Sequence, residues 1–361
     1  MLMNSFRHGG DVWQGKDPGD WIDFSANLNP EGTPEKMMDE IKNSIEEIGF
    51  YPDQNMWEAK KNISVFLRCD MLNVLPANGG IGALQLIVEC ERPQKAIIIE
   101  PSFLEYKRLS INAGAEIIRI PMLKNDSIIW DVNRIKKEMT CDSMIFICSP
   151  SNPLGNLVER KLLADLIEHS EKIGGKILLD EAFIDYCDER CSARDLIGRF
   201  DSLIIIGSFT KMFAIPGVRL GYVLASKESI DKYQKHMMPW MLSAQAVGAS
   251  RALPGLRDFA EQSRIKNNHL REDLASKLSK LGFKVFDSEG SYLLVKIKDD
   301  NIQLDIIEKR LKEYKILIRN CSNYECLGER YFRVGVKSDR ENRILIESLK
   351  KVLSDLNKEG K

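Results

Sequence analysis

The sequence predicts an α/β protein with a large domain, in which a mostly parallel sheet lies between helices, and a smaller α+β domain. Three observations support this expectation. The chain has 361 residues, too many for one small core. From about Trp57, short apolar runs alternate with helical stretches, as in parallel α/β sheets. After roughly Pro254, strand signals follow a long amphipathic stretch, which favours antiparallel strands with helices on one side.

The predicted boundaries divide the chain into three parts. Residues 1–50 are too irregular for a domain of their own, so we expect them to join the small domain and help line a site. Residues 51–250 form the large domain, and residues 251–361 form the small C-terminal domain.

The elements of the large domain are predicted from residue type and spacing. Helical patterns cover residues 57–68, 81–91, 103–113 and 159–173. Short apolar runs predict strands at residues 95–99, 116–120, 143–148, 176–179, 203–206 and 220–224. The run at 203–206 is β-branched and ends at Gly207, which indicates a buried parallel strand.

The small domain begins with the amphipathic stretch at residues 256–281. Strand signals follow at residues 283–286, 292–297, 316–318 and 331–336, with helices between them.

Charge and hydropathy exclude several classes of partner. The 52 Lys and Arg residues balance 53 Asp and Glu residues, so a formal charge of −1 provides no basic field for nucleic acid or an anionic membrane. No apolar run approaches membrane-spanning length, and residues 1–10 lack the apolar core of a signal peptide. We therefore expect a cytoplasmic protein.

The eight cysteines form no Cys-x-x-Cys pair and have no nearby histidine to complete a zinc set. We predict reduced core cysteines and no metal. A disulfide or metal role for the close pairs Cys187 with Cys191 and Cys321 with Cys326 is the less favoured alternative.

Polar residues follow three of the predicted strands. Asn152 comes after the strand at 143–148, Asp180 after that at 176–179, and Lys211 after that at 203–206. Ligands bind at the carboxyl edge of open α/β sheets. If the three strands are neighbours, an amide, a carboxylate and an amine converge at this edge.

A candidate anion site completes the set. Asn78-Gly79-Gly80-Ile81-Gly82 precedes a helical run, where free N–H groups bind phosphate, and Arg219 supplies a positive charge. These groups together are what pyridoxal 5′-phosphate requires. A lysine binds it covalently, a carboxylate keeps its pyridine nitrogen protonated, and an aromatic ring such as Phe103 stacks on it.

Each feature has an ordinary explanation when taken alone. A lysine after a strand is more often a surface residue, and Asp180 with Glu181 resembles a helix cap. The glycines fit a simple turn, and Phe103 fits a core position. Their order and placement together support the cofactor prediction.

Motifs along most of the chain resemble those of one family. They are His8-Gly9-Gly10, residues 23–30, Tyr51-Pro52-Asp53, residues 180–185, residues 208–222, Met238-Pro239-Trp240 and residues 316–324. The segments around Asp180 and Lys211 are shared by all fold type I pyridoxal-phosphate enzymes. The N-terminal motif, Phe183 in place of a common tyrosine, and Met238-Pro239-Trp240 are more specific. With them the chain resembles the threonine-phosphate decarboxylases of cobalamin biosynthesis, which are relatives of the histidinol-phosphate aminotransferases.

The resemblance implies a fold type I transferase-like fold and a role for each matching residue. Lys211 would hold the cofactor, Asp180 would pair with its pyridine nitrogen, and Asn152 would bond its ring oxygen. The remaining cofactor contacts implied are Gly80, Ile81, Ser208, Thr210 and Arg219 on the phosphate, with Phe103 and Phe183 beside the ring. Tyr51 would reach the cofactor phosphate of the other subunit, so a homodimer is implied.

The resemblance also implies a substrate site. Arg333 would bind the α-carboxylate, where a planar guanidinium can bond bidentately. The substrate phosphate would contact Arg319, Asn27 and the segment His8, Gly9 and Gly10, with Asn152 nearby. An exposed ion pair for either arginine, and a mobile chain end for His8, are the alternatives. Two departures from the family affect substrate preference and cofactor affinity: Gly80-Ile81-Gly82, which offers only backbone donors, and Ser291-Tyr292, where Asn-Tyr is usual.

The implied reaction is decarboxylation of L-threonine phosphate or L-serine phosphate to the amino-alcohol phosphate of the cobalamin linker. One methyl group separates the two substrates and is worth only ~1 to 3 kcal/mol in a pocket. A histidinol-phosphate aminotransferase is the alternative enzyme, and a cofactor-binding sensor without turnover is the alternative from another class.

Overall fold

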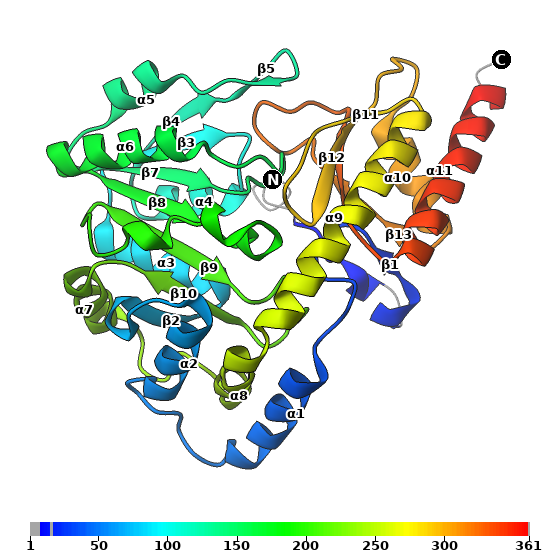
Figure 1. The fold of residues 1–361 in the computed structure, drawn as a ribbon. Helices are drawn as coiled ribbons and strands as arrows, with labels where there is room; N and C mark the ends of the chain where they lie inside the picture. Colours follow the sequence, from blue (N-terminus) through cyan, green and yellow to red (C-terminus); the bar gives the residue numbers. More distant parts are fainter. Residues whose placement is uncertain (1–7, 15–16, 360–361) are drawn as a thin grey trace.

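Two sheets of different size organise the protein in this computed structural model, which describes residues 8–14 and 17–359 (Figure 1). The larger sheet has the strand order β2-β10-β9-β8-β7-β3-β4. Its strands are β2 (Val74–Asn78), β3 (Lys95–Glu100), β4 (Glu116–Pro121), β7 (Ser143–Cys148), β8 (Lys176–Asp180), β9 (Leu203–Ser208) and β10 (Leu220–Leu224).

The central strands are apolar and buried throughout. Every residue of β7, β9 and β10 is buried, as expected for strands covered on both faces. Strands β7, β8 and β9 are direct parallel neighbours, so their carboxyl ends meet at one edge of the sheet. Because the three strands are neighbours, Asn152, Asp180 and Lys211, which lie at or after their ends, come to the same edge, as expected.

The predicted mostly parallel sheet is confirmed from β9 to β4, but its other end differs. Strand β10 pairs antiparallel with both β9 and β2. The expectation of a mostly parallel sheet assigns no orientation to residues 220–224, and β10 returns antiparallel because residues 209–219 form turns and contain no crossover helix. Apolar patterning misses β2, which contains Pro76. Proline is tolerated there because β2 lies at the edge of the sheet.

Helices flank the large sheet. They are α2 (Trp57–Leu67), α3 (Gly79–Glu91), α4 (Leu104–Asn112), α5 (Val132–Glu138), α6 (Arg160–Ile173), α7 (Lys227–His236) and α8 (Ala244–Ala252). Helix α3 begins directly after β2 and packs on β9 and β10, so its N-terminus lies at the same edge as the ends of β8 and β9. A small hairpin, β5 (Leu123–Lys124) with β6 (Ser127–Ile128), extends from this part of the chain.

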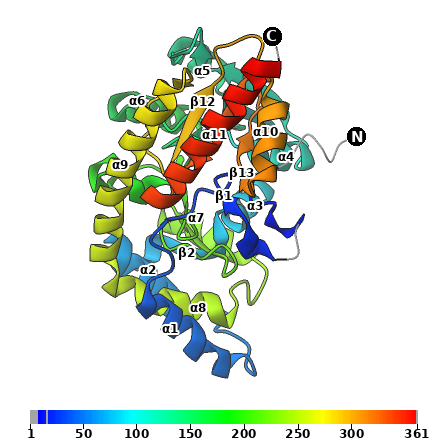
Figure 2. The same ribbon diagram turned by 90° about the vertical axis from the view of Figure 1, so that its right-hand side faces the viewer.

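The smaller sheet has the order β11-β12-β15-β14 and is antiparallel. Its strands are β11 (Lys284–Val285), β12 (Tyr292–Lys296), β14 (Arg319–Asn320) and β15 (Tyr331–Gly335). Figure 2 shows the long helix α9 (Arg257–Lys280) with α10 (Leu304–Glu313) and α11 (Asp339–Glu359) side by side over this sheet. The three helices and the sheet enclose a second hydrophobic core. The predicted antiparallel strands with helices on one side are thereby confirmed.

One predicted strand divides into two. Of the predicted residues 316–318, the first two form β13 (Ile316–Leu317), which pairs in parallel with β1 (Ile22–Asp23), and a second strand, β14 (Arg319–Asn320), begins just beyond the predicted range and pairs with β15. The chain changes partner at Ile318, a switch that apolar patterning does not reveal. Through β1, the N-terminal segment is joined to the elements of the small sheet.

The N-terminal segment also contains a helix that the sequence analysis misses. Helix α1 (Glu35–Asn43) packs against α8, with Met37 buried. A Cβ atom at Gly248 would lie 2.6 Å from the Glu40 carbonyl oxygen, so glycine permits this close approach. A helix this short is marginal in isolation even with an amphipathic pattern, so packing against a remote part of the chain stabilises it.

The division of the chain at residues 50 and 250 stays a proposal. Residues 1–7, which belong to its first part, lie outside the described residues. Most of the segment for which no signal peptide is predicted, residues 1–10, is therefore also outside them. Among the helices of residues 8–14 and 17–359, none is both long and apolar enough to cross a membrane.

Candidate active site

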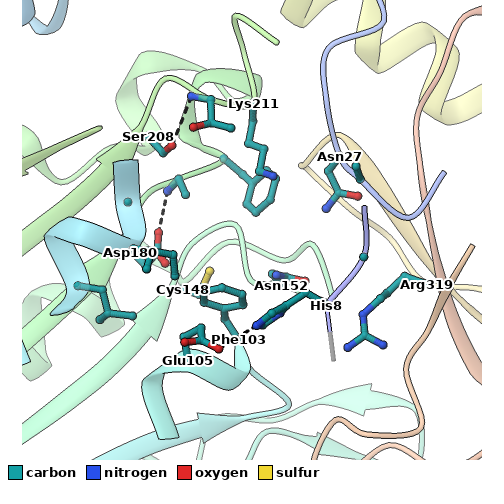
Figure 3. A pocket seen from close by; sticks show the side chains of 18 of the residues that line it. His8, Asn27, Phe103, Glu105, Cys148, Asn152, Asp180, Ser208, Lys211 and Arg319 are labelled. Carbon is teal, nitrogen blue, oxygen red and sulfur yellow. Dashed lines mark hydrogen bonds and ion pairs between the residues drawn. The ribbon is translucent and has the colours of Figure 1, made fainter. Parts of the chain in front are cut away.

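A cavity of about 570 Å³ lies at the carboxyl ends of β7, β8 and β9, between the large and small sheets (Figure 3). All the predicted site residues line it except Gly10 and Tyr51. Those that do are His8, Gly9, Asn27, Gly80, Ile81, Phe103, Asn152, Asp180, Phe183, Ser208, Thr210, Lys211, Arg219, Arg319 and Arg333. In Figure 3, Asp180 and Ser208 lie on the left of the cavity, and Asn27, His8 and Arg319 on the right.

Lys211 follows β9 and is held through its backbone. Its carbonyl oxygen accepts hydrogen bonds from the Tyr186 hydroxyl at 3.0 Å and from the Asn29 N–H at 3.0 Å. Burial, followed by the positive charges of Arg333 and Arg219, lowers the pKa of Lys211 to about 8. Roughly one tenth of the amine is therefore neutral, and nucleophilic, at pH 7, far more than for an ordinary lysine.

Asp180 ends β8 and is 7% exposed. The Tyr106 hydroxyl donates to Oδ2 at 2.6 Å, and the Ala182 N–H donates to Oδ1 at 2.9 Å. Burial raises the pKa of Asp180, while these two hydrogen bonds act in the opposite direction. An oriented carboxylate in such surroundings is suited to pair with a protonated ring nitrogen.

Asn152 lies in the loop after β7 and connects the two sheets. Its Oδ1 atom accepts from the Arg333 guanidinium and, at 3.3 Å, from the Tyr324 hydroxyl. The Nδ2 group is thereby left as the donor that Asn152 can offer to a ligand.

The glycine-rich turn forms the start of α3 beside Arg219. Gly79 has φ of +69°, a conformation that favours glycine, and a Cβ atom there would lie 2.3 Å from Nη2 of Arg219. A Cβ atom at Gly221 would lie 2.5 Å from the Gly79 carbonyl carbon. Glycine at both positions lets the helix start, the arginine and the end of β9 come together.

These residues fit pyridoxal 5′-phosphate. The α3 N-terminus, Ser208 and Arg219 form an anion site, and the hydroxyl of Thr210 is buried there without a partner among the described residues. The amine of Lys211 and the carboxylate of Asp180 open into the same cavity. Phe103 is a ring available for stacking, with its centroid 5.7 Å from that of Tyr106.

Two arginines stand opposite each other at the other side of the cavity. Arg319 of β14 and Arg333 of β15 are paired in the strand register, and each is 5% exposed. Arg333 donates to the Ser25 carbonyl oxygen at 2.8 Å, and its Nε has no partner within residues 8–14 and 17–359. Arg319 donates to Asn323 Oδ1 at 2.8 Å. Like charges in directly opposed positions destabilise a sheet, so this arrangement favours bound anions.

Nearby, Asn27 is 2% exposed, and its Oδ1 atom has no partner among the described residues. Gly10 does not line the cavity, but its N–H donates to the Ser25 hydroxyl at 2.7 Å and so holds the segment that does. Tyr51 lies away from this cavity and is 80% exposed, with its ring centroid 4.6 Å from that of Trp240.

Sequence reasoning misses eight lining residues. They are Ser25, Ala26, Leu84, Glu105, Arg108, Cys148, Ala182 and Tyr324. Four of them lie inside motifs already identified from the sequence, so their place in those motifs could have predicted that they line the site: Ser25, Ala26, Ala182 and Tyr324. Glu105 and Arg108 come from α4 and carry no motif, and only the packing of α4 shows their place. Tyr106 donates a hydrogen bond to Asp180, and the sequence likewise carries no motif that predicts this contact.

The cysteines at residues 69, 90, 141, 148, 187, 191, 321 and 326 are all free thiols. The two close pairs are thus not disulfides, which corrects that alternative. Within the described parts of the chain, no group of three potential metal-ligating side chains occurs.

Comparison with known proteins agrees with this geometry. Residues 19–349 match the family described as aminotransferase class I and II. The threonine-phosphate decarboxylase of Salmonella typhimurium is 30% identical, over 99% of this chain and 99% of that protein. The histidinol-phosphate aminotransferase of Methanococcus aeolicus is 28% identical, over 93% of this chain and 91% of that protein.

Among solved structures, the histidinol-phosphate aminotransferase from Clostridium acetobutylicum superposes with a TM-score of 0.85 and 27% identity, covering 92% of this chain and 99% of that one. The family match over residues 19–349 covers both sheets and all the cavity residues except His8 and Gly9. The chain belongs to the class I and II aminotransferase family.

Proposed function

We propose that this protein is a pyridoxal-phosphate-dependent decarboxylase of an O-phosphorylated hydroxy amino acid, either L-threonine phosphate or L-serine phosphate. The observation that carries the proposal is the pair of opposed, buried arginines, Arg319 and Arg333. Such a substrate has two anionic groups, a carboxylate and a phosphate, and can neutralise both guanidinium groups. The similarity to the threonine-phosphate decarboxylase of Salmonella typhimurium supports this choice.

The cofactor is pyridoxal 5′-phosphate, held by Lys211 and Asp180, and its phosphate is bound at the start of α3 by Gly80, Ser208 and Arg219. When bound, it supplies an electron sink for the bond that breaks at the substrate Cα. In this proposal, the protein's own task is orientation. Arg333 binds the substrate carboxylate and Arg319 the phosphate, and the resulting pose decides which bond at Cα breaks.

Lys211 has a second task once the substrate is bound. Its lowered pKa of about 8 makes it suited to move a proton, because a general acid or base works best near the operating pH. We infer that Lys211 donates the proton that replaces the departing carboxylate at Cα. The product is then an amino-alcohol phosphate and carbon dioxide.

The second candidate is a histidinol-phosphate aminotransferase, favoured by the similarity to the Methanococcus aeolicus enzyme and the Clostridium acetobutylicum structure. Histidinol phosphate has only one anionic group, but the 2-oxoglutarate used in the same reaction has two carboxylates and can neutralise both opposed arginines. The greater identity and coverage of the Salmonella typhimurium decarboxylase therefore favour the phosphorylated amino acid.

One assay distinguishes the two reactions. Purified protein is incubated with L-threonine phosphate, L-serine phosphate, or histidinol phosphate plus 2-oxoglutarate, and carbon dioxide and glutamate are both measured. We expect carbon dioxide from the first or second substrate and no glutamate from the third. Glutamate formation would contradict the decarboxylase, and a spectral change with neither product would indicate a cofactor-binding sensor.

We further propose a homodimer. Large exposed apolar residues are concentrated after α1 and after α7, and the rings of Tyr51 and Trp240 join the two groups, with centroids 4.6 Å apart; the residues are Ile45, Ile48, Phe50, Tyr51, Trp57, Met238 and Trp240. A patch of this composition typically marks a protein interface. A second copy of the chain is the occupant that fits the expected role of Tyr51, which lies outside its own cavity and would complete that of its partner.

The dimer is tested by complementation between two impaired variants. Tyr51→Ala and Lys211→Ala are mixed in equal amounts, dissociated and reassembled. If Tyr51 acts across the interface, each mixed dimer contains one intact site, and random pairing restores about one quarter of wild-type activity. No recovery, despite sedimentation that shows mixed dimers, would place Tyr51 in its own subunit's site or in none.

A further inference from the structure

A buried carboxylate lies in the cavity between His8 and Arg108. Glu105, the second residue of α4, is 5% exposed. His8 Nε2 lies 2.8 Å from its Oε1, and Arg108 Nε donates to its Oε2 at 2.6 Å (Figure 3). Both oxygens of this carboxylate are thus engaged by groups that line the cavity.

The carboxylate stays ionised because of these partners. Burial alone would raise the pKa of Glu105, but the hydrogen bonds from His8 and Arg108 outweigh it and lower the pKa. An ionised carboxylate only accepts hydrogen bonds, so His8 Nε2 carries the hydrogen. Nδ1 is then the ring nitrogen that remains for a ligand, and it can bond an ionised phosphate only by donating, so the ring must carry a hydrogen on both nitrogens when the phosphate binds.

The segment that carries His8 is fixed at two points. Glu105 holds it at His8, and the Ser25 hydroxyl holds it at Gly10, where the N–H to Oγ distance is 2.7 Å. Ser25 in turn donates to Asp23 Oδ1 at 2.5 Å. A Cβ atom at Gly9 would lie 2.4 Å from the Ser25 carbonyl oxygen, so glycine permits the segment to lie this close.

The ion pair with Arg108 gives one electrostatic reason for an acid here, but it does not require the bond to His8. If the cavity binds a phosphate ester, a negative charge beside the phosphate opposes binding. An acid in the first turn of a helix does stabilise that helix, but an exposed one would serve equally. The buried position and the bond to His8 indicate a different role.

We propose that Glu105 is a positioning residue for substrate recognition, which holds the His8 imidazole where it can bond the phosphate of the substrate. The proposal rests on the proposed function, because it assumes a phosphorylated substrate. It extends the phosphate site beyond Arg319 and Asn27 to an acidic residue that never touches the phosphate itself.

The sign of one substitution tests the proposal. Affinity for inorganic phosphate is measured by calorimetry on the holoenzyme at about pH 6, where a free imidazole is mostly protonated, for the wild type and Glu105→Gln. A positioning role predicts weaker binding in the variant, by roughly tenfold for the loss of a charged hydrogen bond. Simple removal of a negative charge predicts tighter binding, and that result would overturn the proposal.

A double-mutant cycle identifies the residue through which Glu105 acts. In a His8→Ala background, Glu105→Gln is expected to cause no further loss of phosphate affinity. An equal loss with and without His8 would show that the carboxylate acts elsewhere. In steady state, KM for the phosphorylated amino acid should rise about tenfold in Glu105→Gln while kcat changes less than about threefold.

Two controls separate positioning from folding. Glu91 is a matched carboxylate at the far end of α3, which accepts from the Tyr233 hydroxyl at 2.6 Å and Lys232 Nζ at 2.8 Å. Glu91→Gln should leave phosphate affinity unchanged. If Glu105→Gln does not fold, Ser25→Ala is the second variant, because it removes the hydrogen bond from the Gly10 N–H that fixes the same segment. Ser25→Ala should also weaken phosphate binding. Unchanged phosphate affinity in Ser25→Ala would contradict the proposal.

The outcome is separable from that of the proposed function. Carbon dioxide release by the wild type decides the reaction, whereas the phosphate cycle depends only on binding. A wild-type protein that releases carbon dioxide but shows no coupling between Glu105 and His8 would overturn this inference alone. A wild-type holoenzyme that does not bind phosphate would overturn it as well.

Discussion

Lys211→Ala is expected to abolish the absorbance of the covalent cofactor link and nearly all turnover. The amine supplies both the covalent attachment and the proton transfer at Cα, and proton transfer alone contributes roughly 10²–10⁴-fold to the rate. Absorbance spectra and carbon dioxide release of wild type and variant provide the measurement. Lys227→Ala, on the exposed start of α7, is the matched control and should behave as wild type.

The pH dependence of cofactor attachment adds a second readout for the same lysine. The pKa of Lys211 is lowered to about 8, so its amine is protonated below that pH and free above it. With cofactor-free protein, the rate of attachment should rise with pH and level off above about pH 8. A rate still rising in proportion to hydroxide up to pH 10 would show an ordinary exposed lysine. Surviving absorbance in Lys211→Ala would contradict the attachment site itself.

Asp180→Asn is expected to cause the second largest loss. The substitution removes the buried charge that would face the protonated ring nitrogen, and breaking such a pair costs about 3–5 kcal/mol. A cost of that size in the transition state lowers kcat by roughly 10²–10⁴-fold. The fold should survive, since asparagine keeps the shape of the carboxylate: its Oδ1 can still accept from the Ala182 N–H, and its Nδ2 can donate to the Tyr106 hydroxyl, which also accepts hydrogen bonds.

The measurement that isolates this effect is a comparison with Tyr106→Phe. That variant leaves the charge of Asp180 in place and removes only the hydrogen bond at 2.6 Å, so its loss of kcat should be much smaller. If Asp180→Asn and Tyr106→Phe lose kcat equally, the hydrogen-bond geometry and not the charge of Asp180 controls the reaction. If Asp180→Asn keeps full activity, the pairing with the ring nitrogen is wrong.

Sequence alone predicts the part of the site that follows from strand ends. Asn152, Asp180 and Lys211 come directly after buried strands, and a parallel sheet brings such positions to one edge. The strands themselves are predictable because continuous apolar runs have few other structures available.

The parts that sequence does not predict depend on contacts between distant segments. Tyr106 and Glu105 are ordinary residues of α4 until the helix packs beside Asp180 and the N-terminal segment. Helix α1 forms against α8, more than two hundred residues later in the chain, and β10 reverses direction after a turn. No local pattern records such pairings, so periodicity cannot anticipate them.

The parallel pairing of β1 with β13 has a consequence for how this chain can change. The groups for the cofactor come from one stretch, residues 79–219, on the large sheet, whereas His8, Asn27, Arg319 and Arg333 come from segments near the two ends of the chain. A mutation near either end therefore acts mainly on which molecule is accepted, although Arg333 also lowers the pKa of Lys211 and so acts on the chemistry as well. New specificities are accessible to this architecture one segment at a time, which is consistent with the two differently named kinds of enzyme that it resembles.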